Sequence, residues 1–152
     1  MRHLHGLNPL TATILLATAM FLSGCSGTIP DTLGVINEKL PACPDKPNCV
    51  VSHLYDDEHQ IDPLTYSGEL AAAHAQLVKS IEQIPGSKII TNSERYIHAE
   101  FTSQIMRYVD DVEFYFNNEE KIIDLRSASR LGHSDMGVNR ERIETLRGFF
   151  KP

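Results

Sequence analysis

The sequence predicts an α+β fold, in which a four-stranded antiparallel sheet carries two helices packed on one face. Residues 68–84 place apolar side chains at helical spacing, residues 87–129 alternate apolar and polar side chains at the period of a strand, and residues 139–150 return to helical spacing. The links between the strand-like segments are short, so neighbouring strands are expected to pair antiparallel.

The segment 68–84, GELAAAHAQLVKSIEQI, is the predicted first helix of the domain. Ser67 is its expected N-cap, and Pro85 and Gly86 are expected to end it. Its apolar face is formed by Leu70, Leu77, Ile81 and Ile84. His74 flanks that face and is predicted to be a packed histidine rather than a ligand.

The predicted strands lie in SKIITNS, RYIHAEFTS, QIMRYVDDVEFYFNN and KIIDLRSAS, which are rich in β-branched and aromatic residues. Alternation places two apolar sets on one side of the sheet, namely Ile97, Ala99 and Phe101, and Val112, Phe114 and Phe116. The second helix, residues 139–150, has Asn139 as its expected cap. Its expected buried stripe is Ile143, Leu146 and Phe150. We expect both helices to cover the apolar side of the sheet.

The first 24 residues are predicted to be a bacterial lipoprotein signal peptide. Arg2 precedes an uncharged apolar run that is shorter than the roughly 20 residues of a transmembrane helix, and LSGC follows directly. The thiol of Cys25 is expected to receive a diacylglyceryl group, and acyl chains such as palmitate would hold the mature protein on a membrane. The alternative is a plain signal peptide cut near the same place, with Cys25 left as a free thiol.

The predicted organisation is a signal peptide at residues 1–24, a lipidated N-terminus and tether at residues 25–40, and a single α+β domain at residues 41–152. Ser26, the second residue of the mature chain, matches the pattern of lipoproteins sorted to the outer membrane. The expected location is therefore the periplasmic face of that membrane, and the first expected partner is the lipid bilayer, through Cys25.

The charge of the chain argues against a nucleic-acid-binding protein. The formal net charge is −6, and an excess of positive over negative charge is found only at the C-terminal end, in residues 126–152. The sequence contains no phosphate loop, dinucleotide fingerprint or HExxH motif, so no cofactor or metal is expected. The possible further partners are another envelope protein or a small anionic ligand.

Cys43 and Cys49, in CPDKPNC, are predicted to form a disulfide, because an exported protein meets an oxidising compartment. Closing this seven-residue loop would stabilise the fold by about 2 to 2.5 kcal/mol. The alternative is a metal site that adds His53 to the two cysteines, which gives only three ligands at an unusual spacing.

The stretch RSASRLGHSDMGVNRERI, residues 126–143, gathers arginines in a glycine-containing loop before a helix. It could bind an anion at arginine forks and free backbone N–H groups. The candidate residues for such a site are Arg126, Ser127, Ser129, Arg130, Ser134, Asp135, Asn139, Arg140 and Arg142. The alternative, which we favour, is an internal clamp in which Asp110, Asp111 or Asp135 neutralises the arginines.

No catalytic residue is predicted. His133, Ser134 and Asp135 form a triad only in sequence, and a triad depends on spatial roles that adjacency does not supply. Asp110 and Asp111 are neighbours on one strand and should point to opposite faces, which argues against a paired acid and base.

Three motifs, CPDKPNCVVS, RYVDDVEFYF and RSASRLGHSDMGVNRERI, resemble the domain-of-unknown-function 1499 family of bacteria and plastids. The resemblance covers about residues 33 to 150, with Val51 at a position where the family pattern usually has serine. It implies one fold unit and no particular reaction. We therefore expect a non-enzymatic envelope binding or scaffold domain. The alternative is a hydrolase or ligand-processing enzyme whose anionic substrate is held by the Arg126–Arg142 loop.

Overall fold

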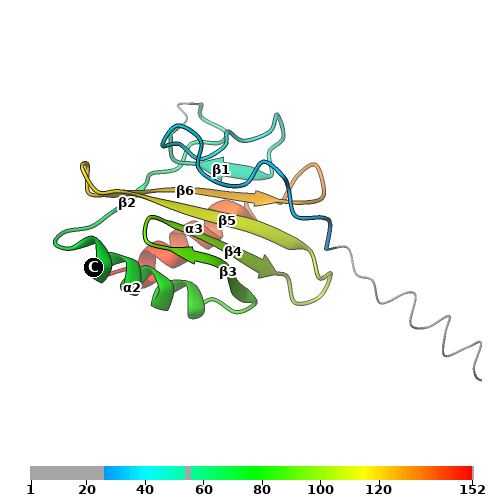
Figure 1. The fold of residues 1–152 in the computed structure, drawn as a ribbon. Helices are drawn as coiled ribbons and strands as arrows, with labels where there is room; N and C mark the ends of the chain where they lie inside the picture. Colours follow the sequence, from blue (N-terminus) through cyan, green and yellow to red (C-terminus); the bar gives the residue numbers. More distant parts are fainter. Residues whose placement is uncertain (1–25, 54–55, 152) are drawn as a thin grey trace, which may run out of the picture.

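The computed structural model describes residues 26–53 and 56–151, and within them a six-stranded antiparallel sheet forms the centre of the molecule (Figure 1). The strand order is β1-β6-β5-β4-β3, and β2 also pairs with β6. The strands are β1 (Cys49–Val51), β2 (Leu64–Thr65), β3 (Ser87–Ser93), β4 (Tyr96–Thr102), β5 (Val109–Asn117) and β6 (Ile122–Ser129). The predicted signal peptide and Cys25 lie outside the described residues.

The prediction of four strands is wrong, although β3 to β6 and their antiparallel pairing are confirmed. The two additional strands both pair with β6, where Val51 lies opposite Arg126 and Leu64 opposite Ile123. They have three and two residues, so neither is long enough to show an alternating pattern in the sequence. Their pairing is determined by the long β6 strand, which offers a free edge to the segment before the first helix.

The helices α2 (Leu70–Glu82) and α3 (Val138–Phe149) share one apolar core with the sheet. Leu77 and Ile81 of α2 and Ile143 and Leu146 of α3 are fully buried with Phe114 of β5. The core therefore lies between the helices and the predicted apolar face of the sheet.

Both predicted helix caps are wrong. The residue that caps α2 is Glu69 rather than Ser67, and it makes no side-chain hydrogen bond to the helix. Helix α3 begins one residue before Asn139, after Gly137 in the left-handed region (φ 85°). The carboxylate of Asp135 accepts hydrogen bonds from the backbone N–H groups of Gly137 and Asn139, at 2.9 and 2.8 Å.

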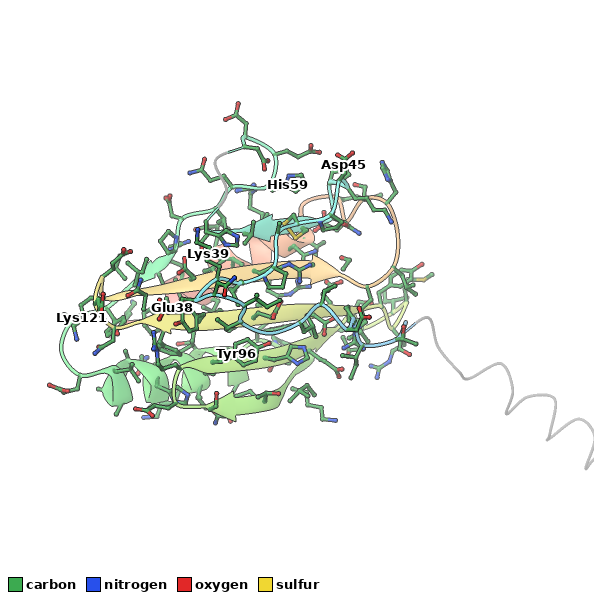
Figure 2. All side chains as sticks on the ribbon, turned by 45° about the horizontal axis from the view of Figure 1, so that its top comes forward. Glu38, Lys39, Asp45, His59, Tyr96 and Lys121 are labelled. Carbon is green, nitrogen blue, oxygen red and sulfur yellow. A yellow bond between two sulfur atoms is a disulfide. The ribbon has the colours of Figure 1, made fainter. Side chains whose placement is uncertain are left out.

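The opposite face of the sheet is covered by residues 26–48, here called the cover segment, which runs along it as an irregular chain (Figure 2). The backbone N–H of Gly34 donates to Glu113 Oε1 of β5 at 2.7 Å, and Leu40 is 3% exposed. Gly27 lies so close to the residues that follow β6 that a Cβ there would be 3.0 Å from the Cβ of Arg130. Residues 26–40, expected to be a tether, thus contact the sheet.

Candidate functional site

The strand β6 divides the predicted anion-binding residues between the two faces of the sheet. Arg126 and Arg130 lie on the face under the cover segment, where they meet Glu113 and Asp111 of β5. Ser127 and Ser129 alternate with them and point to the helix side, where they meet Asn139. The nine candidates therefore do not form a single site.

Under the cover segment, the carboxylate of Glu113 is fully buried and accepts three hydrogen bonds. Its donors are Arg126 Nη1 at 3.1 Å, Tyr96 Oη at 2.9 Å and the N–H of Gly34 at 2.7 Å. Burial, together with the adjacent Glu113 carboxylate, raises the pKa of the Tyr96 phenol, so this hydroxyl remains a donor. Arg126 and Glu113 are thus an ion pair within the fold.

Beside this pair, Asp111 binds the guanidinium of Arg130 through two hydrogen bonds, from Nε at 2.8 Å and from Nη2 at 2.7 Å. His98 Nε2 lies 2.7 Å from the same carboxylate, and Arg130 also pairs with Glu100. Burial by itself opposes ionisation of Asp111, but the bonds from Arg130 and His98 outweigh it and hold its pKa below the ordinary value. Bonding to Asp111 raises the pKa of Arg130.

Six ionisable groups on this face that are joined by ion pairs are here called the charged cluster, which consists of His98, Glu100, Asp111, Glu113, Arg126 and Arg130. The sequence prediction included Asp111 and both arginines. It missed His98, Glu100 and Glu113, although strand alternation could have placed them on the same face as Asp111.

A cavity of about 390 Å³ lies between the cover segment and the charged cluster. Pro30, Thr32 and Pro41 line it from the cover segment, and Arg126 and Arg130 line it from the sheet. Arg126 Nε is buried and has no hydrogen-bond partner among the described residues. Among the described residues, it is the only donor of the charged cluster that is both buried and without a partner.

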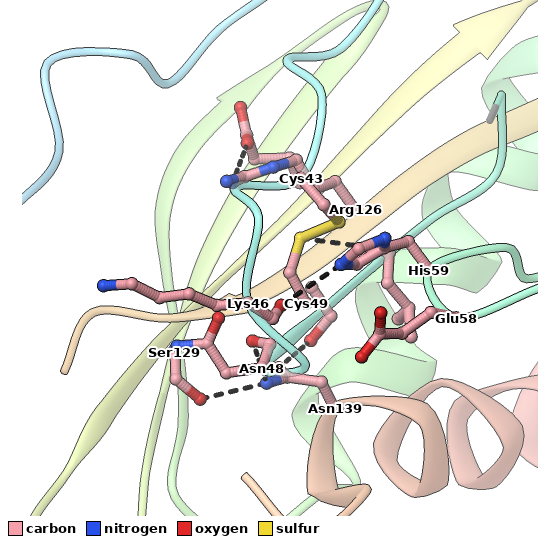
Figure 3. Close-up of a disulfide and its surroundings, with 12 residues drawn as sticks. Cys43, Lys46, Asn48, Cys49, Glu58, His59, Arg126, Ser129 and Asn139 are labelled. Carbon is pink, nitrogen blue, oxygen red and sulfur yellow. Dashed lines mark hydrogen bonds and ion pairs between the residues drawn. A yellow bond between two sulfur atoms is a disulfide. The ribbon is translucent and has the colours of Figure 1, made fainter. Parts of the chain in front are cut away.

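On the helix side, Asn139 is fully buried and joins β6 to the turn before β1. Its Nδ2 donates to the carbonyl of Asn48, to Ser129 Oγ and to Asp135 Oδ2, at 3.0, 3.0 and 2.8 Å. Ser127 Oγ donates to its Oδ1. Figure 3 shows Asn48, Ser129 and Asn139 grouped below the disulfide.

Arg142 extends this network toward the sheet. Its Nη1 donates to Ser127 Oγ and Asn139 Oδ1, at 3.0 and 2.6 Å, and its Nη2 pairs with Asp110 Oδ2. Its guanidinium lies 5.0 Å from the centre of the Phe101 ring. Asp110 and Asp111 therefore point to opposite faces, as their adjacency predicts, and each neutralises a different arginine.

Two further arginines of α3 hold the connection between β1 and β2 through its backbone. Arg140 donates to the carbonyls of Gln60 and Glu58, at 2.7 and 3.0 Å. Arg147, which the sequence prediction did not include, donates to the carbonyls of Pro63 and Asp62, at 2.9 and 2.7 Å. The arginines of this helix thus bind chain segments far away in the sequence.

The predicted disulfide between Cys43 and Cys49 is present, and it joins the cover segment to β1 beside Arg126 and His59 (Figure 3). Because the two sulfur atoms are bonded to each other in this structure, neither is free to act as a thiolate ligand in the alternative site with His53. Within residues 26–53 and 56–151, no three His, Cys, Asp or Glu side chains are grouped as metal ligands.

His133, Ser134 and Asp135 lie in the loop before α3, and among the described residues no hydrogen bond connects one of these side chains to another. His133 is exposed, Ser134 Oγ accepts from the N–H of Met136, and Asp135 binds the start of α3. The triad that their adjacency suggests is therefore not formed in this geometry.

The model of one protein family, described as a protein of unknown function (DUF1499), matches residues 39–150. No curated protein matches the chain. In the part of the chain that the structure describes, no helix has the length and apolar character needed to cross a membrane.

Proposed function

The chain belongs to the DUF1499 family, and we propose that it serves as a lipid-anchored, non-enzymatic binding or scaffold domain at the periplasmic face of the bacterial outer membrane. The anchor would be Cys25, in the motif LSGC, after a signal peptide of 24 residues. A disulfide in the domain fits an oxidising compartment.

The non-enzymatic part of this proposal rests on one observation, namely that the arginines bind carboxylates of the same chain. Arg126, Arg130 and Arg142 each bind a carboxylate of β5, and these ion pairs are largely buried. An arginine that holds a substrate needs donors directed at the substrate. These guanidinium groups instead fasten the end of β6 and helix α3 to β5, as a structural clamp does.

One observation favours the second candidate, a ligand-processing enzyme for a small anionic substrate. The cavity beside Arg126 and Arg130 could hold a small molecule, and Arg126 Nε is an unused donor at its wall. The charge balance opposes it, because Glu100, Asp111 and Glu113 already outnumber the two arginines. The positive charge of the two arginines is thus already balanced by carboxylates, which disfavours binding of an added anion.

Thermal unfolding of the full-length protein with and without phosphate, at matched ionic strength, separates the two candidates. A binding or scaffold domain should show no phosphate-dependent rise in melting temperature, because only a ligand that binds the native state stabilises it. A rise that disappears in Arg126→Met would favour the second candidate and contradict the first.

The anchor is tested by Cys25→Ala. We expect unprocessed precursor without incorporated palmitate, because the acyl-accepting thiol is gone, whereas Cys43→Ala with Cys49→Ala should still be processed. Normal processing and acylation of Cys25→Ala would refute the anchor. Ser26→Asp tests the proposed location at the outer membrane. We expect this variant to remain acylated and to be lost from the outer-membrane fraction.

A further inference from the structure

Exposed apolar side chains are concentrated at one end of the sheet. Ten large apolar side chains are exposed among the described residues, and six of them lie in two loops at this end. These six, here called the apolar end, are Ile105, Met106 and Tyr108 between β4 and β5, and Leu131, Met136 and Val138 between β6 and the first turn of α3. Ile105 is 89% exposed and Met136 is 97% exposed, so both project into solvent.

The two loops lie side by side. Both line one cavity of about 450 Å³, to which Tyr108 contributes from the first loop and Leu131 and Val138 from the second. The N–H of Arg130 donates to the carbonyl of Val109 where the loops leave the sheet. Figure 1 shows both loops at the end of the molecule where the described chain begins, with the C-terminus at the opposite end.

The start of the described chain is fixed against the same end. A Cβ on Gly27 would lie 3.0 Å from Arg130 Cβ and 3.2 Å from Leu131 Cγ, so the backbone of Gly27 is packed on this loop. Cys25 precedes Gly27 by two residues, and a fully extended chain spans at most about 3.6 Å per residue. A lipid on Cys25 would therefore be joined to Gly27 by at most about 7 Å of backbone.

We propose that the apolar end is a membrane-docking surface that lies in the interfacial region of the bilayer that holds the lipid of Cys25. This inference rests on the proposed anchor, since acyl chains on Cys25 bring the lipid headgroups to the loop that carries Leu131. With so little chain between Cys25 and Gly27, the domain cannot move away from the bilayer while Gly27 stays packed. Ile105, Met106 and Met136 then enter the acyl boundary as the apolar residues of an interfacial segment do.

The polar groups at this end fit a headgroup layer. Arg107 is exposed between Met106 and Tyr108, where it can meet lipid phosphates, and Tyr108 has the amphipathic ring that is enriched at membrane interfaces. Two carboxylates at this end already have partners within the fold, because Asp110 pairs with Arg142 and Asp135 accepts hydrogen bonds from the N–H groups at the start of α3. Docking does not have to break these interactions.

Tryptophan fluorescence tests this proposal, because the chain contains no natural tryptophan. The full-length acylated protein is prepared as Met106→Trp, Met136→Trp or the control Phe149→Trp, an exposed position near the C-terminus. Each variant is reconstituted into vesicles of phosphatidylcholine and phosphatidylglycerol, with or without bromine on the acyl chains. We expect bromine to quench about half of the emission at positions 106 and 136 and little of it at position 149.

The outcomes separate the docking surface from the anchor. Protein that floats with the vesicles but shows equal, weak quenching at all three positions would overturn the docking surface and leave the anchor in place. Emission that is blue-shifted at positions 106 and 136 without bromine quenching would also overturn it, since a protein partner or a second copy would then cover this end. Protein that lacks acyl chains and stays in solution would refute both the anchor and the inference that rests on it.

Discussion

The two faces of the central sheet are both buried, but by different interactions. Phe114 and Glu113 are neighbours on β5, and each is 0% exposed. Phe114 lies in the apolar core under α2 and α3, whereas Glu113 lies under the cover segment with Arg126, Tyr96 and Gly34 as donors. One strand thus borders an apolar core on one side and an ionic layer on the other.

Equal burial on the two faces therefore does not mean that the same interactions stabilise them. On the helix side, stability comes from apolar area removed from water and from close packing, which depend little on pH or charge. In the charged cluster, each charge is tolerated because its partner is present, so loss of one partner costs more than loss of both. Removal of a single partner from the charged cluster should therefore have the largest effect on stability.

Arg126→Met should lower the free energy of unfolding by about 3 to 5 kcal/mol, because the carboxylate of Glu113 would remain buried without its cation. Glu113→Gln added to this variant should recover part of the loss, since glutamine removes the charge and still accepts from Tyr96 and Gly34. Urea denaturation of both variants and the wild type measures the difference.

Two controls define what this result means. Phe114→Ala should cost a similar amount, about 3 to 5 kcal/mol, through a cavity that Glu113→Gln does not repair. Arg95→Met should cost less than Arg126→Met, because the Arg95 side chain is 47% exposed and lies 3.8 Å from Glu38, and its bonds to the Phe116 carbonyl and Tyr115 Oη leave no buried charge behind when they are lost. If Arg126→Met were as stable as Arg95→Met, the charged cluster would not be a clamp.

Strand alternation predicts one face of this sheet well and gives an incomplete account of the other. The period of two places Val112 and Phe114 toward the helices, and the same pattern assigns Asp111 and Glu113 to the opposite side. Nothing in that pattern indicates a cover there. The cover segment has no regular period, and it is held by single contacts such as that of Gly34 with Glu113, between residues 79 positions apart in the sequence.

The sequence pattern also predicted the candidate site only in part. The many arginines of residues 126–143 predicted that carboxylates of the same chain would neutralise them. Asp110 and Asp111 do so. The cap predicted at Asn139 failed because its side chain binds Asn48, Ser127 and Ser129, none of which is local to α3. A capping preference is a local property, and here buried partners from β6 and the turn before β1 determine the role of the amide.

Removing the disulfide should have the next largest effect, and it should act mainly on the covered face. Replacing Cys43 and Cys49 together by serine should lower the free energy of unfolding by about 2 to 2.5 kcal/mol, from loss of a seven-residue closed loop. Amide hydrogen exchange should rise most in β1 and in the cover segment, which this bond joins. A reducing agent should reproduce the loss in the wild type and leave the double variant unchanged. Equal stability of the oxidised and reduced wild type would contradict this prediction.

The smallest expected effect is a dependence on pH that comes from His59, which binds the cover segment. Its Nε2 lies 3.1 Å from the carbonyl of Lys46, and its Nδ1 lies 2.8 Å from the carboxylate of Asp56. Both partners only accept, so both ring nitrogens are matched only when the ring is protonated. Burial alone disfavours the charged ring, but the Lys46 carbonyl and Asp56 outweigh it and raise the pKa of His59.

A raised pKa in the folded state gives a stabilisation that is complete below the unfolded value of about 6.5 and is lost as pH rises through the folded value. The wild type should therefore lose stability as the pH rises above about 6.5, and His59→Gln should show a flatter profile over the same window. His133→Gln is the matched control, because His133 is exposed in the loop before α3. Urea midpoints across the window measure both slopes. Parallel profiles for the wild type and His59→Gln would show that this histidine does not hold the cover segment, whereas a flat profile confined to His59→Gln would assign the pH response to the covered face.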